Sequence, residues 1–107
     1  MIMMTKDLLL ITGYNKISII NVNNYKLRII NVPEAGYIWG VCILNQNMLL
    51  TGDSKGIIKQ WRIEDDNLIL VSKKEIAHDD YIRVLLNLGN GHIASGSGSF
   101  DKAIKIW

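Results

Sequence analysis

The sequence of 107 residues lacks a second cysteine, a long apolar run and an excess of one charge. Because Cys42 is the sole cysteine, no disulfide can form within the chain, and its apolar neighbours predict a small buried side chain. No apolar stretch approaches the roughly 20 residues that a membrane-spanning helix needs. Twelve basic against ten acidic residues argue against the clustered positive charge that binds nucleic acid. We therefore expect an intracellular protein, cytoplasmic or nuclear, with no transmembrane segment and no specific nucleic-acid partner.

The sequence does contain many short segments rich in Ile, Val and Leu, separated by clusters of Gly, Asn, Asp and Ser. This pattern is typical of strands and turns, and no window keeps a helical apolar period. The fold class is therefore predicted to be all-β. Ten strands are expected, at residues 8–12, 16–22, 26–32, 38–44, 48–52, 57–63, 68–74, 82–88, 92–97 and 102–107.

These segments repeat along the chain. Residues 48–61 can be aligned with residues 93–107, and both stretches end in tryptophan. A fainter copy ends at Ile20, so that the copy ends lie 41 residues apart (61 minus 20) and then 46 residues apart (107 minus 61). A period in the forties with four strands per unit is typical of β-propellers. The expected repeats cover approximately residues 1–32, 33–76 and 77–107.

The third copy begins with Ala77-His78, continues through an apolar strand at 82–85, and closes with the hairpin Ser97-Gly-Ser-Phe-Asp101 and then Trp107. This order resembles that of the WD-repeat family. The family's pattern has a Gly-His near the start, an inner strand, a Ser-x-Ser-x-Asp hairpin and a closing Trp-Asp. The resemblance implies an incomplete ring of antiparallel four-stranded blades, that is, a segment of a WD-repeat β-propeller.

The other two copies match this pattern less closely. Thr51 and Trp61 of the second copy fit it, but Lys55 stands where the turn Asp belongs. In the first copy Ile20 replaces the tryptophan, and the hairpin turn is about two residues shorter. The resemblance nevertheless covers nearly the whole chain.

The resemblance implies a structural hydrogen-bond tetrad made by His78, Ser97, Asp101 and Trp107. The chemistry of these side chains agrees, since an indole N–H only donates, a hydroxyl accepts and donates, a neutral imidazole does both, and a carboxylate accepts. A fully paired network of this kind fixes strand register. Ser97 is preferred to Ser95 because it lies ten residues before the tryptophan, as Thr51 lies ten before Trp61. Thr51 and Trp61 form a partial second tetrad.

Ser97, His78 and Asp101 are also the residue types of a hydrolase triad. Catalysis is disfavoured because no Gly-x-Ser-x-Gly elbow between a strand and a helix surrounds the serine. The glycines at 89–91 and 96–98 lack the helix and the Lys-Ser/Thr of a phosphate loop. Two His and one Cys, scattered along the chain, do not predict a metal site. We expect no enzyme activity, no cofactor and no metal.

In WD-repeat propellers, residues at the start of the innermost strand and the residue before the turn Asp face one end of the central channel. The matching positions here are Tyr37, Trp39, Ser54, Tyr81, Arg83 and Phe100. Trp, Tyr and Arg anchor the hot spots of protein interfaces. These residues are therefore the candidate partner-binding set, although Trp39 and Tyr81 can alternatively pack between blades.

The resemblance implies a non-catalytic scaffold that binds other proteins or peptides. An alternative is a set of auxiliary binding repeats within a larger protein whose catalytic or membrane-associated domain lies outside this chain. A propeller enzyme is disfavoured, since the channel-end positions carry aromatic residues and one Arg rather than paired acids.

Ten strands supply two and a half blades, whereas propellers have about four to eight. The chain is expected to open with the second, third and fourth strands of one blade and to end with the first three strands of another. Copies joined end to end would then overlap strands instead of completing a blade. Further blades from a longer chain are therefore expected to be needed.

Overall fold

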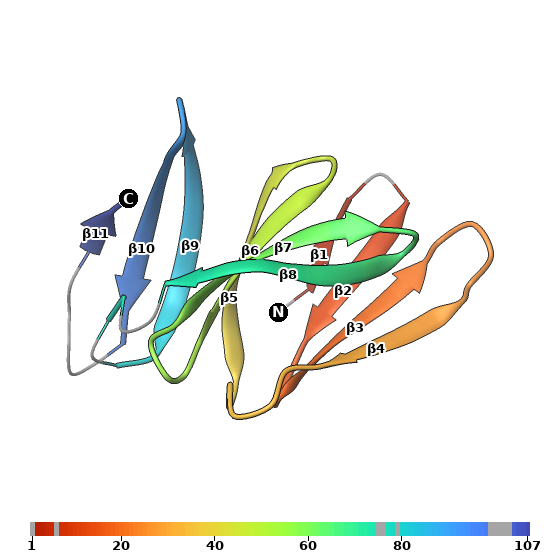
Figure 1. Cartoon of the computed structure of the whole chain (residues 1–107), viewed down its shortest axis with the longest axis horizontal. Coiled ribbons are helices and arrows are strands. Elements are labelled where there is room, and N and C mark those ends of the chain that lie inside the picture. Colours follow the sequence, from red (N-terminus) through yellow and green to blue (C-terminus); the bar gives the residue numbers. More distant parts are fainter. Residues whose placement is uncertain (1, 6, 75–76, 79, 99–103) are drawn as a thin grey trace.

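A computed structural model describes residues 2–5, 7–74, 77–78, 80–98 and 104–107 of the chain. These residues form eleven strands and no helix. The strands make three separate antiparallel sheets, which follow one another along the sequence (Figure 1). The expected all-β fold is confirmed at this level. No helix among the described residues is long and apolar enough to cross a membrane.

The first sheet contains β1 (Ile2–Met4), β2 (Leu8–Thr12), β3 (Lys16–Asn21) and β4 (Leu27–Asn31), hydrogen-bonded in that order. The sequence did not predict β1, because three residues are too few to show a period of two. The expectation that the chain opens with only three strands of a unit is therefore wrong. Its first sheet has four strands.

The middle sheet contains β5 (Ile38–Asn45), β6 (Met48–Asp53), β7 (Ile58–Glu64) and β8 (Asn67–Lys74), again in chain order. The third sheet contains β9 (Ile82–Gly89), β10 (His92–Ser97) and β11 (Ile104–Ile106), with β10 in the centre. Every predicted strand occurs, with its ends within two residues of the expected ones. The start of the last predicted strand, residues 102–103, lies outside the described residues.

The middle sheet is covered on both faces, and this explains its apolar sequence. In β6, Leu49 and Leu50 point to opposite faces, as successive strand residues do, and both are buried. Leu49 belongs to the core shared with the first sheet, and Leu50 to the core shared with the third. A strand buried on both faces reads as a continuous apolar run, not as an alternation.

Cys42 lies in the second of these cores, with 4% of its surface exposed. The expectation of a small buried side chain is confirmed. Burial raises the pKa of the Cys42 thiol above its usual value, and a hydrogen bond with the backbone of Asn87 opposes this shift. The thiol is therefore held in its neutral form.

The three sheets stack in chain order, first on middle and middle on third, and they do not close a ring among the described residues. Each of the ranges 1–32, 33–76 and 77–107 contains the strands of one sheet. This arrangement leaves one face of the first sheet and one face of the third sheet uncovered, and it brings the starts of β5 and β9 together.

Candidate functional site

Two tryptophan–hydroxyl hydrogen bonds stabilise the sheets, one of them fully buried and the other partly buried. Trp61 Nε1 donates to Thr51 Oγ1 at 2.9 Å, which confirms the contact expected for the second copy. In the third sheet, Trp107 Nε1 donates to a serine Oγ at 2.7 Å, and His78 Nε2 lies 2.7 Å from the same oxygen. His78 is 1% exposed. These hydrogen bonds pair the polar groups inside the protein, as buried polar groups require.

The serine in this network is Ser95, so the choice of Ser97 was wrong. Ser95 lies opposite Lys105 in the β10–β11 pairing, as Thr51 lies opposite Lys59 in the β6–β7 pairing. Strand register therefore makes Ser95 the equivalent of Thr51. Residue spacing pointed to Ser97 instead, because the third hairpin is longer than the second by two residues. The Ser97 hydroxyl instead hydrogen-bonds the Gly98 carbonyl at 3.4 Å. Asp101, the fourth expected member, lies outside the described residues.

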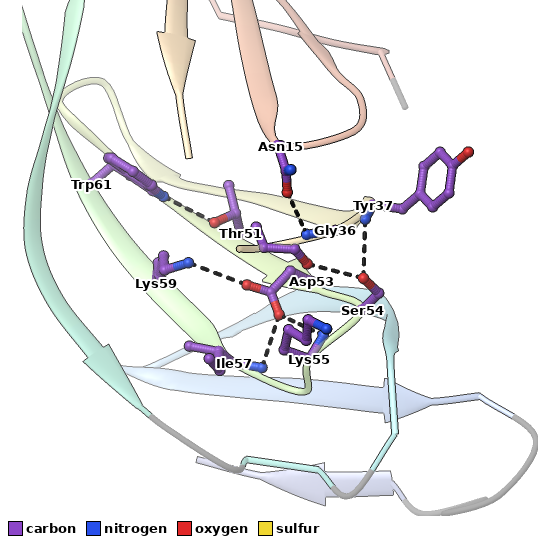
Figure 2. Close-up of polar contacts among 11 residues, drawn as sticks. Asn15, Gly36, Tyr37, Thr51, Asp53, Ser54, Lys55, Ile57, Lys59 and Trp61 are labelled. Carbon is purple, nitrogen blue, oxygen red and sulfur yellow. Dashed lines mark hydrogen bonds and ion pairs between the residues drawn. The ribbon is translucent and has the colours of Figure 1, made fainter. Parts of the chain in front are cut away.

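A buried carboxylate, Asp53, organises the β6–β7 hairpin (Figure 2). Its Oδ1 accepts hydrogen bonds from the backbone N–H groups of Lys55 and Ile57 at 2.9 and 3.2 Å, and its Oδ2 pairs with Lys59 Nζ at 3.3 Å. The sequence interpretation placed Lys55 where the family's pattern has its turn acid, and it did not identify Asp53. The acid lies two residues earlier, as the turn sequence Asp-Ser-Lys-Gly56 could have indicated.

The hydroxyl of Ser54, a residue expected to bind a partner, hydrogen-bonds within the protein instead. Its hydroxyl donates to the Ala35 carbonyl at 2.9 Å and accepts from the Tyr37 N–H at 3.0 Å (Figure 2). Asn15 Oδ1 also accepts from the Gly36 N–H at 2.7 Å. Together these bonds fix the backbone immediately before β5. Ser54 therefore positions Tyr37 and does not offer its own hydroxyl proton to a partner.

A contiguous row of rings crosses the edges of the three sheets. The ring centroids of Tyr14 and Tyr37 are 5.0 Å apart, those of Tyr37 and Trp39 are 5.3 Å apart, and those of Trp39 and Tyr81 are 6.4 Å apart. The Arg83 guanidinium lies 5.9 Å from the Tyr81 centroid. We call these five residues the aromatic row. The three ring-to-ring distances are typical of paired aromatic rings, and the distance from Arg83 to Tyr81 is typical of a cation over a ring.

The row is held in place by ordinary strand geometry. At the start of β5, Ile38 and Gly40 are buried, so Trp39 between them must point outward. At the start of β9, buried Ile82 leaves Arg83 on the exposed side in the same way. Tyr14, in the β2–β3 turn, is linked to the residue before β5 by an isolated antiparallel bridge. The residues Tyr14, Tyr37 and Trp39 remain 59%, 52% and 41% exposed.

Tyr81 is the most enclosed ring of the row. A Cβ at Gly98 would lie only 2.2 Å from the Tyr81 ring, and the Gly98 N–H donates to the Tyr81 carbonyl at 2.9 Å. The ring therefore lies directly on the glycine backbone. Trp39 and Tyr81 contact each other between two sheets, as the packing alternative expected, while Trp39 still presents a large exposed surface.

The structure brings together four of the six candidate residues: Tyr37, Trp39, Tyr81 and Arg83. Ser54 has the supporting role described above, and Phe100 lies outside the described residues. The sequence interpretation missed Tyr14. Its position in the first hairpin corresponds to that of Ser54 in the second, so the same positional rule, applied to the first copy, would have found it.

A hollow of about 690 Å³ borders the Tyr14 end of the row. Its lining includes Tyr14, Glu34, Lys55, Lys59 and Lys73. No group of three or more His, Cys, Asp or Glu side chains with metal-binding geometry occurs in the described part of the chain. The site is thus a surface of rings with cationic side chains near both ends.

No family model and no curated protein matches the sequence. Among solved structures, the chain is similar to the computationally designed Ika4 protein, with a TM-score of 0.72 and 15% sequence identity. The similarity covers 99% of this chain and 62% of that protein. At this identity the likeness concerns the fold alone, and it confirms that the three-sheet arrangement occurs in a solved structure.

Proposed function

We propose that the chain is a segment of a WD-repeat β-propeller and acts as a non-catalytic scaffold that binds a peptide segment of another protein. Three successive antiparallel sheets and two tryptophan–hydroxyl pairs at register-equivalent positions support the propeller assignment. In this proposal each sheet is one blade.

The aromatic row is the observation that carries the binding proposal. Exposed tyrosine and tryptophan side chains combine a large apolar area with a polar tip, and with arginine they dominate interface hot spots. The rings already contact one another, and hydrogen bonds at Ser54 fix the backbone that bears Tyr37. Little side-chain entropy is then lost on binding, which favours affinity.

The chemistry of the row indicates the kind of peptide it fits. Apolar or proline side chains would pack against the rings of Tyr37 and Trp39, as proline-rich segments do on aromatic-lined surfaces. Arg83 is exposed beside Tyr81, and Lys55 lines the hollow beside Tyr14. A carboxylate near either end of the peptide would pair with these cations. The favoured partner is an extended apolar segment flanked by acidic residues.

Selection from a display library of random peptides tests this proposal. Peptides enriched on the wild-type chain should bind Trp39→Ala more weakly by about tenfold or more, as expected for a hot-spot residue. Tyr25→Ala is the matched control, because Tyr25 is an exposed ring in the β3–β4 turn and stacks on no other ring among the described residues. Equal loss of binding in both variants, or none in Trp39→Ala, would contradict the proposal.

A further inference from the structure

Corresponding residues can be identified in the three sheets from strand pairing alone. On one face of each sheet, the residue pairs that correspond are Leu9 with Ile20, Leu49 with Trp61, and Ile93 with Trp107. The next residues along the strands point to the other face, and there the corresponding pairs are Leu10 with Ile19, Leu50 with Gln60, and Ala94 with Ile106. We call the first the leading face of a sheet and the second its trailing face.

Inside the chain, a leading face always packs on the trailing face of the preceding sheet. Leu49 and Trp61 of the middle sheet share a core with Leu10 and Ile19 of the first sheet. The third sheet repeats this arrangement, with Ile93 and Trp107 against Leu50 of the middle sheet. One kind of interface therefore occurs twice.

The chain leaves one half of this interface uncovered at each end. The trailing face of the third sheet exposes Leu86 at 56%, Ile104 at 81% and Ile106 at 58%. Two further β9 residues on this face, Val84 and Leu88, are also exposed. Apolar patches of this kind mark interaction surfaces in soluble proteins.

The uncovered leading face of the first sheet is also apolar. It includes Leu9, Ile11 and Ile20, which are partly exposed. Ile11 and Ile20 occupy the positions of the hydrogen-bonded Thr51 and Trp61 in the middle sheet. With isoleucine at both positions, this face has no hydroxyl–indole pair to satisfy, so burying Ile11 and Ile20 against another apolar face leaves no polar group of theirs unpaired.

We propose that these two faces bind each other between two copies of the chain, leading face to trailing face. Each contact would continue the interface that already joins the sheets within one chain. A head-to-tail contact closes into a ring when the rotation allows it. Two copies supply six sheets, twice the three of one chain, and this lies within the range of about four to eight blades known for propellers.

This dimer avoids the obstacle that the sequence raised against self-association. Sheets that stack face to face need not share or exchange strands, and the first sheet already has four strands of its own. The proposal goes beyond the binding function and does not depend on the aromatic row. If the dimer is not found, the proposal of peptide binding by the aromatic row still stands, and the converse also holds.

Light scattering coupled to size exclusion gives the first test on the purified chain. The expected mass is twice the 12.1 kDa of one chain. Leu86→Lys on the trailing face and Ile20→Lys on the leading face should each halve that mass. Val71→Lys is the matched control, because Val71 is a similarly exposed apolar residue on β8 of the middle sheet, and its dimer should persist.

Mixing the two lysine variants decides how the faces are paired. A mixed dimer retains one contact between a wild-type leading face and a wild-type trailing face, so the mixture should recover the doubled mass. If either variant unfolds alone, the mixture should also recover β-structure in circular dichroism. The proposal would be overturned by a monomeric wild type or by a dimer that survives both substitutions. It would also be overturned by a dimer that is lost only with Leu86→Lys, since that result indicates a symmetric contact of two trailing faces.

Discussion

Trp61 donates its indole hydrogen to the hydroxyl of Thr51 at 2.9 Å, and both side chains are buried where the middle sheet meets the first. The indole N–H can only donate, so it depends on this acceptor. Trp107 and Ser95 stand in the same relation one sheet later. The structure thus repeats a tryptophan–hydroxyl pair at equivalent points of successive sheets, fully buried in the middle sheet and partly buried in the third.

Thr51→Val should destabilise the chain by about 1–3 kcal/mol, because it leaves the Trp61 N–H buried and unpaired. Thr51→Ser keeps the hydroxyl and is the matched control, with a smaller loss. The measurement is urea unfolding followed by tryptophan fluorescence. Equal stability of the valine and serine variants would show that the hydrogen bond contributes nothing.

Asp53→Asn should lower the free energy of unfolding by about 1–3 kcal/mol. The substitution removes the charge that pairs with Lys59 and weakens acceptance from two backbone N–H groups at a buried position. Asp65→Asn, in an exposed turn, is the control, and its effect should stay within about 0.5 kcal/mol. Thermal unfolding of the two variants in one buffer compares them directly, and equal melting temperatures would rule out a structural role for the Asp53 carboxylate.

Gly52→Ala should destabilise the contact between the middle and third sheets. A Cβ at this position would lie 2.5 Å from Ile82 Cγ2 and 2.9 Å from Ile82 Cβ, so the two sheets must separate or Ile82 must shift. Overpacking of this kind costs about 1–3 kcal/mol. Gly96→Ala is the control, because its Cβ would meet only Val84 Cβ at 3.9 Å. Denaturant midpoints should fall for the first variant and change little for the second.

Cys42 should make the chain less stable at alkaline pH. Because burial raises the thiol pKa in the folded state, the unfolded chain releases this proton at a lower pH than the folded chain does. The contribution of the neutral Cys42 thiol to stability is therefore fully present below the ordinary thiol pKa and is lost as pH rises through the raised value. Over that range the free energy of unfolding falls by at most about 1.4 kcal/mol per pH unit. Above the ordinary thiol pKa, the free energy of unfolding should fall less steeply with pH in Cys42→Ala than in the wild type. Equal slopes in the two proteins would contradict a raised pKa of the Cys42 thiol.

Most strands could be predicted from the sequence because their apolar patterns and turn residues are local. β1 was missed because three residues carry no period, and Ser97 was preferred because hairpin length was assumed constant. The register of paired strands decides which residues are equivalent, and this register does not depend on how many residues the loop between them contains. Asp53 was missed because only the position of the family's turn acid was considered, and Lys55 occupies that position two residues later.

The candidate site was predicted in part. Positions in the family pattern indicated Tyr37, Trp39, Tyr81 and Arg83, and the alternation of strand residues explains why Trp39 and Arg83 point outward. Their contact as one row depends on how three sheets are oriented relative to one another. No local pattern encodes that orientation, so neither the continuity of the row nor its extension to Tyr14 was predictable from spacing.

The most direct test of the binding account is a ¹H–¹⁵N spectrum of the three tryptophan indole N–H groups during titration with a peptide selected on the wild-type chain. Trp39 is exposed in the aromatic row, whereas the Trp61 indole is buried and hydrogen-bonded to Thr51. The account predicts that the Trp39 signal shifts with saturation while the Trp61 signal stays in place, and that Arg83→Ala weakens the titration without loss of β-structure. A peptide that binds without moving the Trp39 signal, or with equal affinity for Arg83→Ala, would contradict it.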